Sequence, residues 1–337
     1  MEEIVLGTIG SGTIVHSVLD AVAVTPGIRL HAVYSRSRDK GEVLAQKYGA
    51  KAVYTELEGL YSDPDVNFIY VASPNSLHYA QTKAALEHGK NVICEKPFCT
   101  TASGARELVQ LAKEKGLFLV DAVPTAFLPN LPLLKEQIGK IGRLRLVIGN
   151  YTQYSSRYKQ LLEGTVTNGF DPNCAGGCLQ DINFYNVYLN IALFGKPMAA
   201  DYYPNMADTG VDTSGVMILK YKDFISTNAG SKDARGESFF QIEGEEGNIC
   251  IPGGSNGLAQ IRVETKEGVS VINAQPNPDR WFYEVQELTP LLLAENHGAI
   301  DSRLETMVSV IETIETARMA AGIHFPGDYL CENNETR

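Results

Sequence analysis

An aspartate and a tyrosine four residues apart could act together on one ligand. Asp181 and Tyr185 lie in residues 177–194, a stretch that predicts a helix. Because residues four apart share one face of a helix, both side chains would reach a common ligand. A phenol with its ordinary pKa of about 10 is a poor base at neutral pH, and a neighbouring ammonium group favours the phenolate. Taken alone, the spacing better fits an aspartate in a first helical turn and a tyrosine packed in the core.

A glycine-rich turn lies near the start of the chain. Residues 7–15 read GTIGSGTIV and join an apolar run to a stretch with helical spacing. Gly10 permits a tight turn, and Gly12, which has no Cβ, lets the backbone approach a pyrophosphate at a helix N-terminus. Val15 stands where the fingerprint has its third glycine. The position between a strand and a helix favours dinucleotide binding over a ligand-free turn. The predicted contacts are Gly10, Gly12, Thr13 and Ile14.

The choice of cofactor depends on the end of the second apolar run. A carboxylate there usually holds the ribose 2′-hydroxyl of NAD. This chain has Ser35, Arg36 and Arg38 instead. A hydroxyl and guanidinium groups favour a 2′-phosphate, so we predict NADP, with NAD as the alternative. In that alternative, Arg36 only stacks on the adenine ring.

The elements that must position these residues alternate between strands and helices in the first part of the chain. This alternation predicts right-handed crossovers and a doubly wound parallel sheet, that is, a Rossmann domain. The apolar runs are 4–9, 28–34, 68–72, 91–94 and 117–122, and the helical stretches are 13–24, 39–48, 76–88 and 106–115.

The rest of the chain has short strands separated by turns and predicts an α+β domain with a largely antiparallel, open-faced sheet. We place an NAD(P)-binding domain at 1–123 and a domain for substrate binding and oligomerisation at 124–337. A closing helix could pack back on the first domain. The strand candidates include 144–148, 216–221, 239–243 and 261–265, and the closing helices are 281–295 and 302–321.

Composition and charge exclude several classes of function. The chain has 337 residues, 44% of them hydrophobic and 20% charged, which is typical of a globular protein. Its net charge of -11 disfavours nucleic acid and anionic lipid as partners. No apolar stretch is long enough to span a membrane, and the acidic start of the chain does not resemble a signal peptide, so a cytoplasmic location is expected.

Metal binding is not expected. The six cysteines are scattered, and Cys174 and Cys178 have no second close pair to complete a zinc site. In a reducing compartment such cysteines are free thiols. With only six histidines and no ligand cluster, the sequence offers no case for a metalloenzyme.

Three further motifs occur in order along nearly the whole chain. They are ASPNSLH at 72–78, GKNVICEKP at 89–97 and GGCLQDINFY at 176–185. Together with the glycine turn, they resemble the Gfo/Idh/MocA oxidoreductases. The branch that contains dimeric dihydrodiol dehydrogenase is nearest, because it shares the arginine at the strand end and the tyrosine of the last motif.

The resemblance implies roles for particular residues. Lys96 reaches the substrate and the nicotinamide ribose, and Glu95 lies by the cofactor. Lys96 and Tyr185 form one proton-transfer unit, in which either could be the proton donor. Asp181 binds a substrate hydroxyl or orients Lys96. The peptide bond between Lys96 and Pro97 is expected to be cis. Further cofactor-binding residues are Ser73, Pro74, Asn75 and His78.

One stretch departs from the family pattern. Many relatives have Glu-Ala, then an arginine, before a proline after the last Rossmann strand. Here Asp121 replaces the glutamate and Ala126 stands in the arginine position. This segment lies near the substrate in relatives. We therefore expect the departure to change which substrate is bound rather than which reaction is catalysed.

These observations predict an NAD(P)-dependent oxidoreductase that moves a hydride to or from a hydroxyl-bearing carbon of a sugar, polyol, diol or similar small molecule. One alternative is a non-catalytic regulator of the same fold that senses sugar or cofactor, but this would not require Lys96 or Tyr185. A second alternative is an NAD-dependent glycosidase, in which the cofactor stays bound. By resemblance, a homo-oligomer formed through the open face of the second-domain sheet is also expected.

Overall fold

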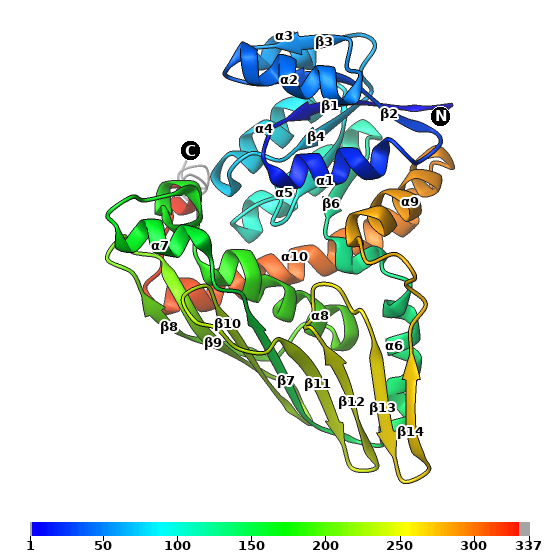
Figure 1. Ribbon diagram of the computed structural model, residues 1–337, viewed down its shortest axis with the longest axis vertical. Coiled ribbons are helices and arrows are strands. Elements are labelled where there is room, and N and C mark those ends of the chain that lie inside the picture. Colours follow the sequence, from blue (N-terminus) through cyan, green and yellow to red (C-terminus); the bar gives the residue numbers. More distant parts are fainter. Residues whose placement is uncertain (1, 330–337) are drawn as a thin grey trace. The chain divides into compact units, whose positions relative to one another are not determined.

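The computed structural model describes residues 2–329, which form two compact units (Figure 1). Unit 1 contains the residues up to Phe127 together with Asp279–Glu305, and unit 2 contains Leu128–Pro278 and the residues from Thr306 onward. The long helix α10, His297–Ala320, contributes to both. Within the described range, the helices are too short or too polar to span a membrane.

Unit 1 is built on a six-stranded parallel sheet with the order β3-β2-β1-β4-β5-β6, which confirms the predicted Rossmann topology. β1 and β4 are buried throughout, as expected for a parallel sheet covered on both faces. The strands are β1 Ile4–Ile9, β2 Ile28–Tyr34, β3 Ala52–Tyr54, β4 Phe68–Val71, β5 Asn91–Glu95 and β6 Leu119–Ala122.

Helices connect these strands, and their ends follow local capping rules. The hydroxyl of Thr101 accepts a hydrogen bond from Gly104 N at the start of α5, and Gly116 ends this helix in the left-handed region. The last helix of unit 1, α9 (Arg280–Leu293), packs against α1, and Gln286 Nε2 donates to Thr25 Oγ1 at 2.8 Å. The other helices are α1 Thr13–Val22, α2 Arg38–Tyr48, α3 Leu57–Tyr61, α4 Asn75–Glu87 and α5 Ala102–Lys115.

Unit 2 is built on an eight-stranded sheet with the order β14-β13-β12-β11-β7-β10-β9-β8. All neighbours are antiparallel except β7 and β10, which confirms the largely antiparallel prediction. The strands are β7 Leu144–Thr152, β8 Ala199–Met206, β9 Asp212–Lys220, β10 Ile225–Ser231, β11 Phe239–Gly244, β12 Gly247–Pro252, β13 Ile261–Thr265 and β14 Gly268–Ile272.

Helix α8 (Phe184–Phe194) lies against one face of this sheet and contacts β7 and β10 (Figure 1). The sheet face it covers has many apolar side chains, and Met217, Phe240, Ile249 and Ile251 are fully buried. The remaining helices of unit 2 are α6 Asn130–Ile138 and α7 Ser156–Leu162. The hydrophobic core therefore lies between α8 and the sheet.

Candidate active site

The glycine turn has the geometry of a phosphate cradle. Gly10 has φ +121°, and a Cβ there would lie 2.5 Å from Ala72 O, so this position needs glycine. Gly12 is the N-cap of α1 and provides no side-chain cap, which leaves the first N–H groups of the helix available. No atom lies within 4 Å of the point where a Gly12 Cβ would stand. Since residues 11–14 are also exposed, this turn fits a pyrophosphate.

The end of β2 lies beside this turn, because Tyr34 pairs with Ile9 in the parallel sheet. The two predicted arginines differ here. Arg38 forms an ion pair with Glu42 at 3.5 Å, whereas Arg36 is exposed and has no ion pair or hydrogen bond within residues 2–329. Ser35 is buried, and its hydroxyl accepts a hydrogen bond from Ser37 N. Both guanidinium groups are thus exposed, and of the two only Arg38 has a partner within residues 2–329.

His78 joins the two loops that follow β4 and β5. Its Nδ1 lies 2.9 Å from Pro97 O and its Nε2 lies 2.8 Å from Ser73 O. The ring is 1% exposed, and burial lowers the pKa of His78. A neutral imidazole donates only one of these hydrogen bonds, and which nitrogen does so depends on the tautomer. His78 therefore connects the two loops from a buried position. Pro74 and Asn75, at the start of α4, are partly exposed.

The Glu95–Lys96–Pro97 motif ends β5 at the carboxyl edge of the sheet, where ligands bind in this architecture. The bond between Lys96 and Pro97 is cis, as expected. Tyr70 on the neighbouring strand donates a 2.7 Å hydrogen bond to Glu95 Oε1. Burial raises the pKa of Glu95, while this hydrogen bond and the charge of Lys96 oppose the shift.

Two more carboxyl groups are buried in unit 1. Glu284 on α9 is 3% exposed, and its carboxyl oxygens have no hydrogen-bond partner within the described chain. Burial, with the nearby charge of Glu95, raises its pKa well above the ordinary range. Asp121 on β6 is 1% exposed, and burial raises its pKa to about 7. Glu284 was not predicted, because an acidic residue in a helix ordinarily faces solvent.

Asp181 lies in a π-helical turn, Leu179–Asn183, which leads directly into α8. The expected helix over 177–194 therefore has a wider first turn, a feature that often occurs at functional sites. The carboxylate of Asp212 holds the start of this turn, because its Oδ2 accepts hydrogen bonds from Leu179 N and Tyr202 Oη. A Cβ on Gly177 would clash with the same carboxylate, so glycine is required there.

Three asparagines connect this helical segment to β10. Asn183 Nδ2 donates to Asn228 O at 3.0 Å, Asn186 Nδ2 donates to Ala229 O at 2.9 Å, and Asn190 Nδ2 donates to Asn228 Oδ1 at 2.8 Å. All three asparagines are fully buried. Because buried amides lose free energy unless they are paired, these hydrogen bonds fix the rotation of the helix on the sheet. They thereby fix the positions of Asp181 and Tyr185.

The two predicted residues of this helix have different surroundings. Tyr185 is 4% exposed, and its ring packs edge-on against Tyr151 with centroids 6.0 Å apart. The Asp181 side chain is 47% exposed, and its Oδ2 lies 2.8 Å from Lys232 Nζ. Lys232 was not predicted because it is 51 residues away in sequence, within a polar stretch that resembles a surface loop.

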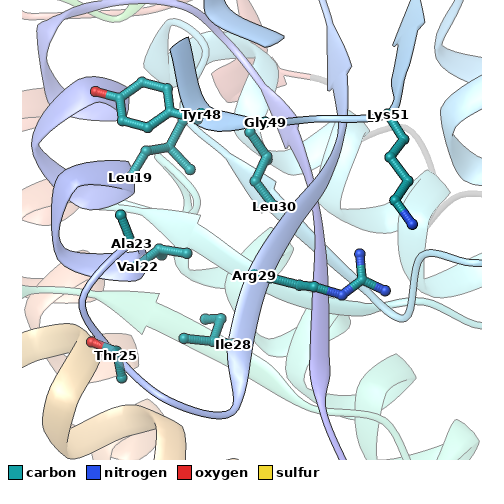
Figure 2. A pocket seen from close by; sticks show the side chains of 10 residues that line it. All are labelled: Leu19, Val22, Ala23, Thr25, Ile28, Arg29, Leu30, Tyr48, Gly49 and Lys51. Carbon is teal, nitrogen blue, oxygen red and sulfur yellow. The ribbon is translucent and has the colours of Figure 1, made fainter. Parts of the chain in front are cut away.

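One hollow of unit 1 does not belong to this site. It has a volume of about 410 Å³ and lies where α1 ends and β2 begins, with Val22, Ile28 and Lys51 in its lining (Figure 2). The glycine turn follows the end of β1, at the opposite edge of a parallel sheet. The hollow is therefore remote from the phosphate cradle.

A cluster of His31, Asp63 and Asp65 has side chains of the metal-binding type. Its geometry instead fits hydrogen bonding. Arg29 Nη1 lies 3.5 Å from His31 Nδ1, and His31 Nε2 lies 3.5 Å from Asp63 Oδ2. The Asp63 carboxylate also accepts hydrogen bonds from Tyr54 Oη and Asp65 N, so hydrogen bonds account for the cluster and we assign no metal site here.

Comparisons with known proteins agree with this geometry. Residues 4–121 match the family model described as "Oxidoreductase family, NAD-binding Rossmann fold". The chain is 33% identical to scyllo-inositol 2-dehydrogenase (NADP+) of Bacillus subtilis over 95% of its length and 98% of the relative. It is 27% identical to trans-1,2-dihydrobenzene-1,2-diol dehydrogenase of Mus musculus over 96% of its length and 98% of the relative.

A solved structure has the same fold. The 3-ketoreductase from Actinomadura kijaniata, in complex with NADP and TDP-benzene, superposes with a TM-score of 0.83 at 20% identity. The superposition covers 96% of this chain and all of the 3-ketoreductase chain. With the motifs, the Rossmann sheet and these relatives in agreement, the chain belongs to the Gfo/Idh/MocA family of oxidoreductases.

Proposed function

We propose that this protein is an NADP-dependent dehydrogenase or reductase that transfers a hydride between the nicotinamide and a CH–OH carbon of a small molecule. The observation that carries the proposal is the position of Lys96. It follows β5 at the carboxyl edge of a parallel sheet whose first turn is an open phosphate cradle. In this assignment unit 1 binds the cofactor and unit 2 contributes the residues that act on the substrate.

The preference for NADP rests on Arg36, an exposed guanidinium at the strand end that ordinarily contacts the adenosine ribose. A carboxylate at this position would repel a 2′-phosphate, whereas a guanidinium can form charge-assisted hydrogen bonds with it. The Bacillus subtilis relative is named as an NADP+ enzyme, which supports the same choice.

In the proposed mechanism the bound nicotinamide supplies the hydride acceptor or donor, and residues of this chain move the proton. Tyr185 takes the proton of the substrate hydroxyl in the oxidative direction and returns it in the reductive direction. Lys96 holds the phenolic oxygen and stabilises negative charge on it. Asp181 accepts a hydrogen bond from a substrate hydroxyl. Lys96 belongs to unit 1 and Tyr185 to unit 2, so their partnership rests on the family motifs.

For the substrate we propose a cyclic polyol or a vicinal diol. The two relatives are named for scyllo-inositol and for a trans-1,2-dihydrodiol, and both substrates have neighbouring hydroxyl groups on a ring. A carboxylate oxygen has two lone pairs, so Asp181 Oδ1, which does not bind Lys232, can accept hydrogen bonds from two neighbouring hydroxyl groups. Ala126, in the position of the arginine in many relatives, removes a cation and suits an uncharged substrate.

A spectrophotometric assay at 340 nm tests this function. We expect NADP+ to be reduced in the presence of scyllo-inositol, other inositols or trans-1,2-diols, and we expect NADPH to be oxidised by the corresponding ketones. A protein that binds NADP but oxidises and reduces none of these compounds would instead be a sensor of the same fold. Hydrolysis of a glycoside without net change at 340 nm would identify an NAD-dependent glycosidase.

We also propose that the protein is cytoplasmic and forms a homo-oligomer through the open face of the unit 2 sheet. One row of paired residues crosses that face from β8 to β11, and Tyr203 and Val216 in it are exposed. Exposed apolar side chains on an open sheet face are typical of a subunit interface. The row consists of Tyr203, Val216, Ala229, Asn150 and Phe239.

Light scattering coupled to gel filtration tests the oligomer. Val216→Arg should shift the protein towards monomer because it places a charge in the interface. Val24→Arg, at an exposed valine in unit 1, is the matched control and should leave the mass unchanged. A wild-type protein that is monomeric at micromolar concentration would overturn this assignment.

A further inference from the structure

Lys232 follows β10 and is almost completely buried, although lysine is rarely buried without a counter-charge. Its side chain is 4% exposed. Its main chain is fixed on both sides, since Lys232 N donates to Thr213 O and Lys232 O accepts from Ser155 N, both at 2.9 Å. The carboxylate of the next residue, Asp233, accepts hydrogen bonds from the hydroxyl groups of Thr213, Ser214 and Ser231.

The ammonium group lies in a close-fitting cage. Nζ donates to Asp181 Oδ2 at 2.8 Å and to Gly169 O at 3.4 Å, and it lies 4.8 Å from the centroid of the Phe170 ring. A Cβ on Gly169 would come within 3.3 Å of Nζ, so the absence of a side chain there makes room for the ammonium. These contacts hold the Lys232 ammonium group against the Asp181 carboxylate.

The two ends of the ion pair differ in exposure. The lysine is buried, whereas the Asp181 side chain is 47% exposed and remains accessible from solvent. Ion pairs between two exposed groups contribute little, because both side chains are mobile and solvated. A buried partner instead fixes one oxygen in place and strongly penalises rupture of the pair, because rupture would leave its own charge uncompensated.

We propose that Lys232 is a positioning residue of the active site. It binds the Asp181 carboxylate and turns one of its oxygens inward, and the carboxylate so oriented accepts a hydrogen bond from a substrate hydroxyl. Lys232 neither touches the substrate nor transfers a proton. The inference rests on the proposed function, in which Asp181 binds substrate. Of the two roles considered for Asp181, it favours hydroxyl binding over orientation of Lys96, because Asp181 has its lysine partner within unit 2.

A double-variant cycle in steady-state kinetics tests the proposal. Lys232→Met keeps an unbranched side chain, one atom shorter, and removes its charge, and it should lower kcat/KM about 10- to 100-fold, as misplacement of a substrate-binding group does. In the Asp181→Asn background the same change should cost less than about twofold, because Lys232 acts only through Asp181. Lys222→Met, at an exposed lysine of unit 2, is the matched control.

Measurements of Tm and of NADPH affinity distinguish a positioning role of Lys232 from a purely structural one. The affinity for NADPH should be unchanged in every variant, because the cofactor residues belong to unit 1. Asp181→Asn alone should lower Tm, and adding Lys232→Met should restore part of the loss, since the uncompensated charge is removed. If Lys232→Met does not fold, Lys232→Gln replaces it in the cycle.

The outcomes are distinguishable. Equal losses from Lys232→Met in both backgrounds, or full kcat/KM per folded molecule in Lys232→Met, would overturn the positioning role while the proposed function stands. A wild-type protein that turns over no polyol, diol or ketone would overturn the proposed function and this inference with it.

Discussion

The hydroxyl of Tyr70 donates a 2.7 Å hydrogen bond to Oε1 of Glu95 and thereby joins β4 to the last residue of β5. Tyr70 is 1% exposed, and its phenol keeps its proton because burial and the charge of Glu95 raise its pKa. The hydrogen bond fixes the carboxylate that directly precedes Lys96. The end of β5, directly before the proposed catalytic Lys96, is therefore fixed by the side chain of Tyr70 as well as by the hydrogen bonds of the sheet.

The catalytic assignment predicts a loss of turnover without a loss of cofactor binding. Tyr185→Phe removes one hydroxyl from a packed ring and should lower kcat about 10²- to 10⁴-fold, the usual contribution of a positioned acid/base. Lys96→Ala should be at least as damaging. The double variant should lose less than the product of the two single losses, because the residues act as a unit.

Kinetics on a confirmed substrate decide between the two candidate proton donors. A mild effect of Tyr185→Phe beside a severe effect of Lys96→Ala would assign the proton transfer to Lys96. Tyr188→Phe, a buried tyrosine on the same helix, controls for packing and should keep wild-type turnover. Near wild-type turnover in both Tyr185→Phe and Lys96→Ala would show that the site lies elsewhere.

The cofactor assignment predicts that Arg36→Ala weakens NADP binding much more than NAD binding. The change removes charge-assisted hydrogen bonds worth roughly 1.5–3 kcal/mol, which corresponds to about a 10- to 100-fold increase in the Kd of NADP. Fluorescence titrations with both cofactors measure it. Arg29→Ala, near the opposite end of β2, is the matched control and should affect neither cofactor strongly. An equal loss for NAD and NADP would assign Arg36 to adenine stacking.

The glycine turn allows binding to be tested separately from folding. Gly12 has open space around its missing Cβ, so Gly12→Val should leave Tm nearly unchanged and abolish binding of both cofactors. Gly10→Ala should instead lower Tm, because its Cβ would meet Ala72 O at 2.5 Å and its φ is +121°. Normal NADP binding by a folded Gly12→Val variant would exclude this loop as the phosphate site.

Asp121 makes stability depend on pH near neutrality. Burial raises its pKa in the folded protein to about 7, above the ordinary 3.8 of an unfolded aspartate. The folded state therefore binds this proton more tightly, so the contribution to stability is full below about pH 4 and is lost as the pH rises through 7. The slope is roughly 1.4 kcal/mol per pH unit between those limits.

Asp121→Asn should flatten this dependence, because the amide does not ionise. Urea unfolding at pH 5 and pH 8 measures the difference in the free energy of unfolding, with Asp208→Asn, at an exposed site, as the control. Asp208→Asn should keep the wild-type pH dependence. If Asp121→Asn and the wild type lose the same stability between pH 5 and pH 8, the assignment of this pH dependence to Asp121 is overturned.

The sequence was informative where local rules decide the structure. The parallel sheet, the glycine turn and the cis bond before Pro97 follow from runs of neighbouring residues or from a family motif. The largely antiparallel class of the unit 2 sheet was predicted, but its strand order was not. β10 pairs with β7 although the two strands are far apart in sequence, and no local pattern encodes that pairing.

The residues that sequence reasoning missed depend on distant contacts. Lys232 and Glu284 have the sequence context of surface residues, and both are buried because elements far apart along the chain enclose them. The π-helical turn at Asp181 was also missed, because its register is set by Asn183 bonding to Asn228 O on β10. Propensity within a single helix does not contain this information.

The asparagine hydrogen bonds between α8 and β10 fix the helix that carries Tyr185 independently of the exposed segments around it. Asn183, Asn186 and Asn190 bond the helix directly to β10, and Ser255 donates a further hydrogen bond to Asn186 Oδ1. Substitutions in exposed segments of unit 2, such as helix α7, can therefore accumulate without displacing Tyr185, which is proposed to move the proton. Selection for a new substrate would act on the rim of the site while the reaction itself is inherited unchanged.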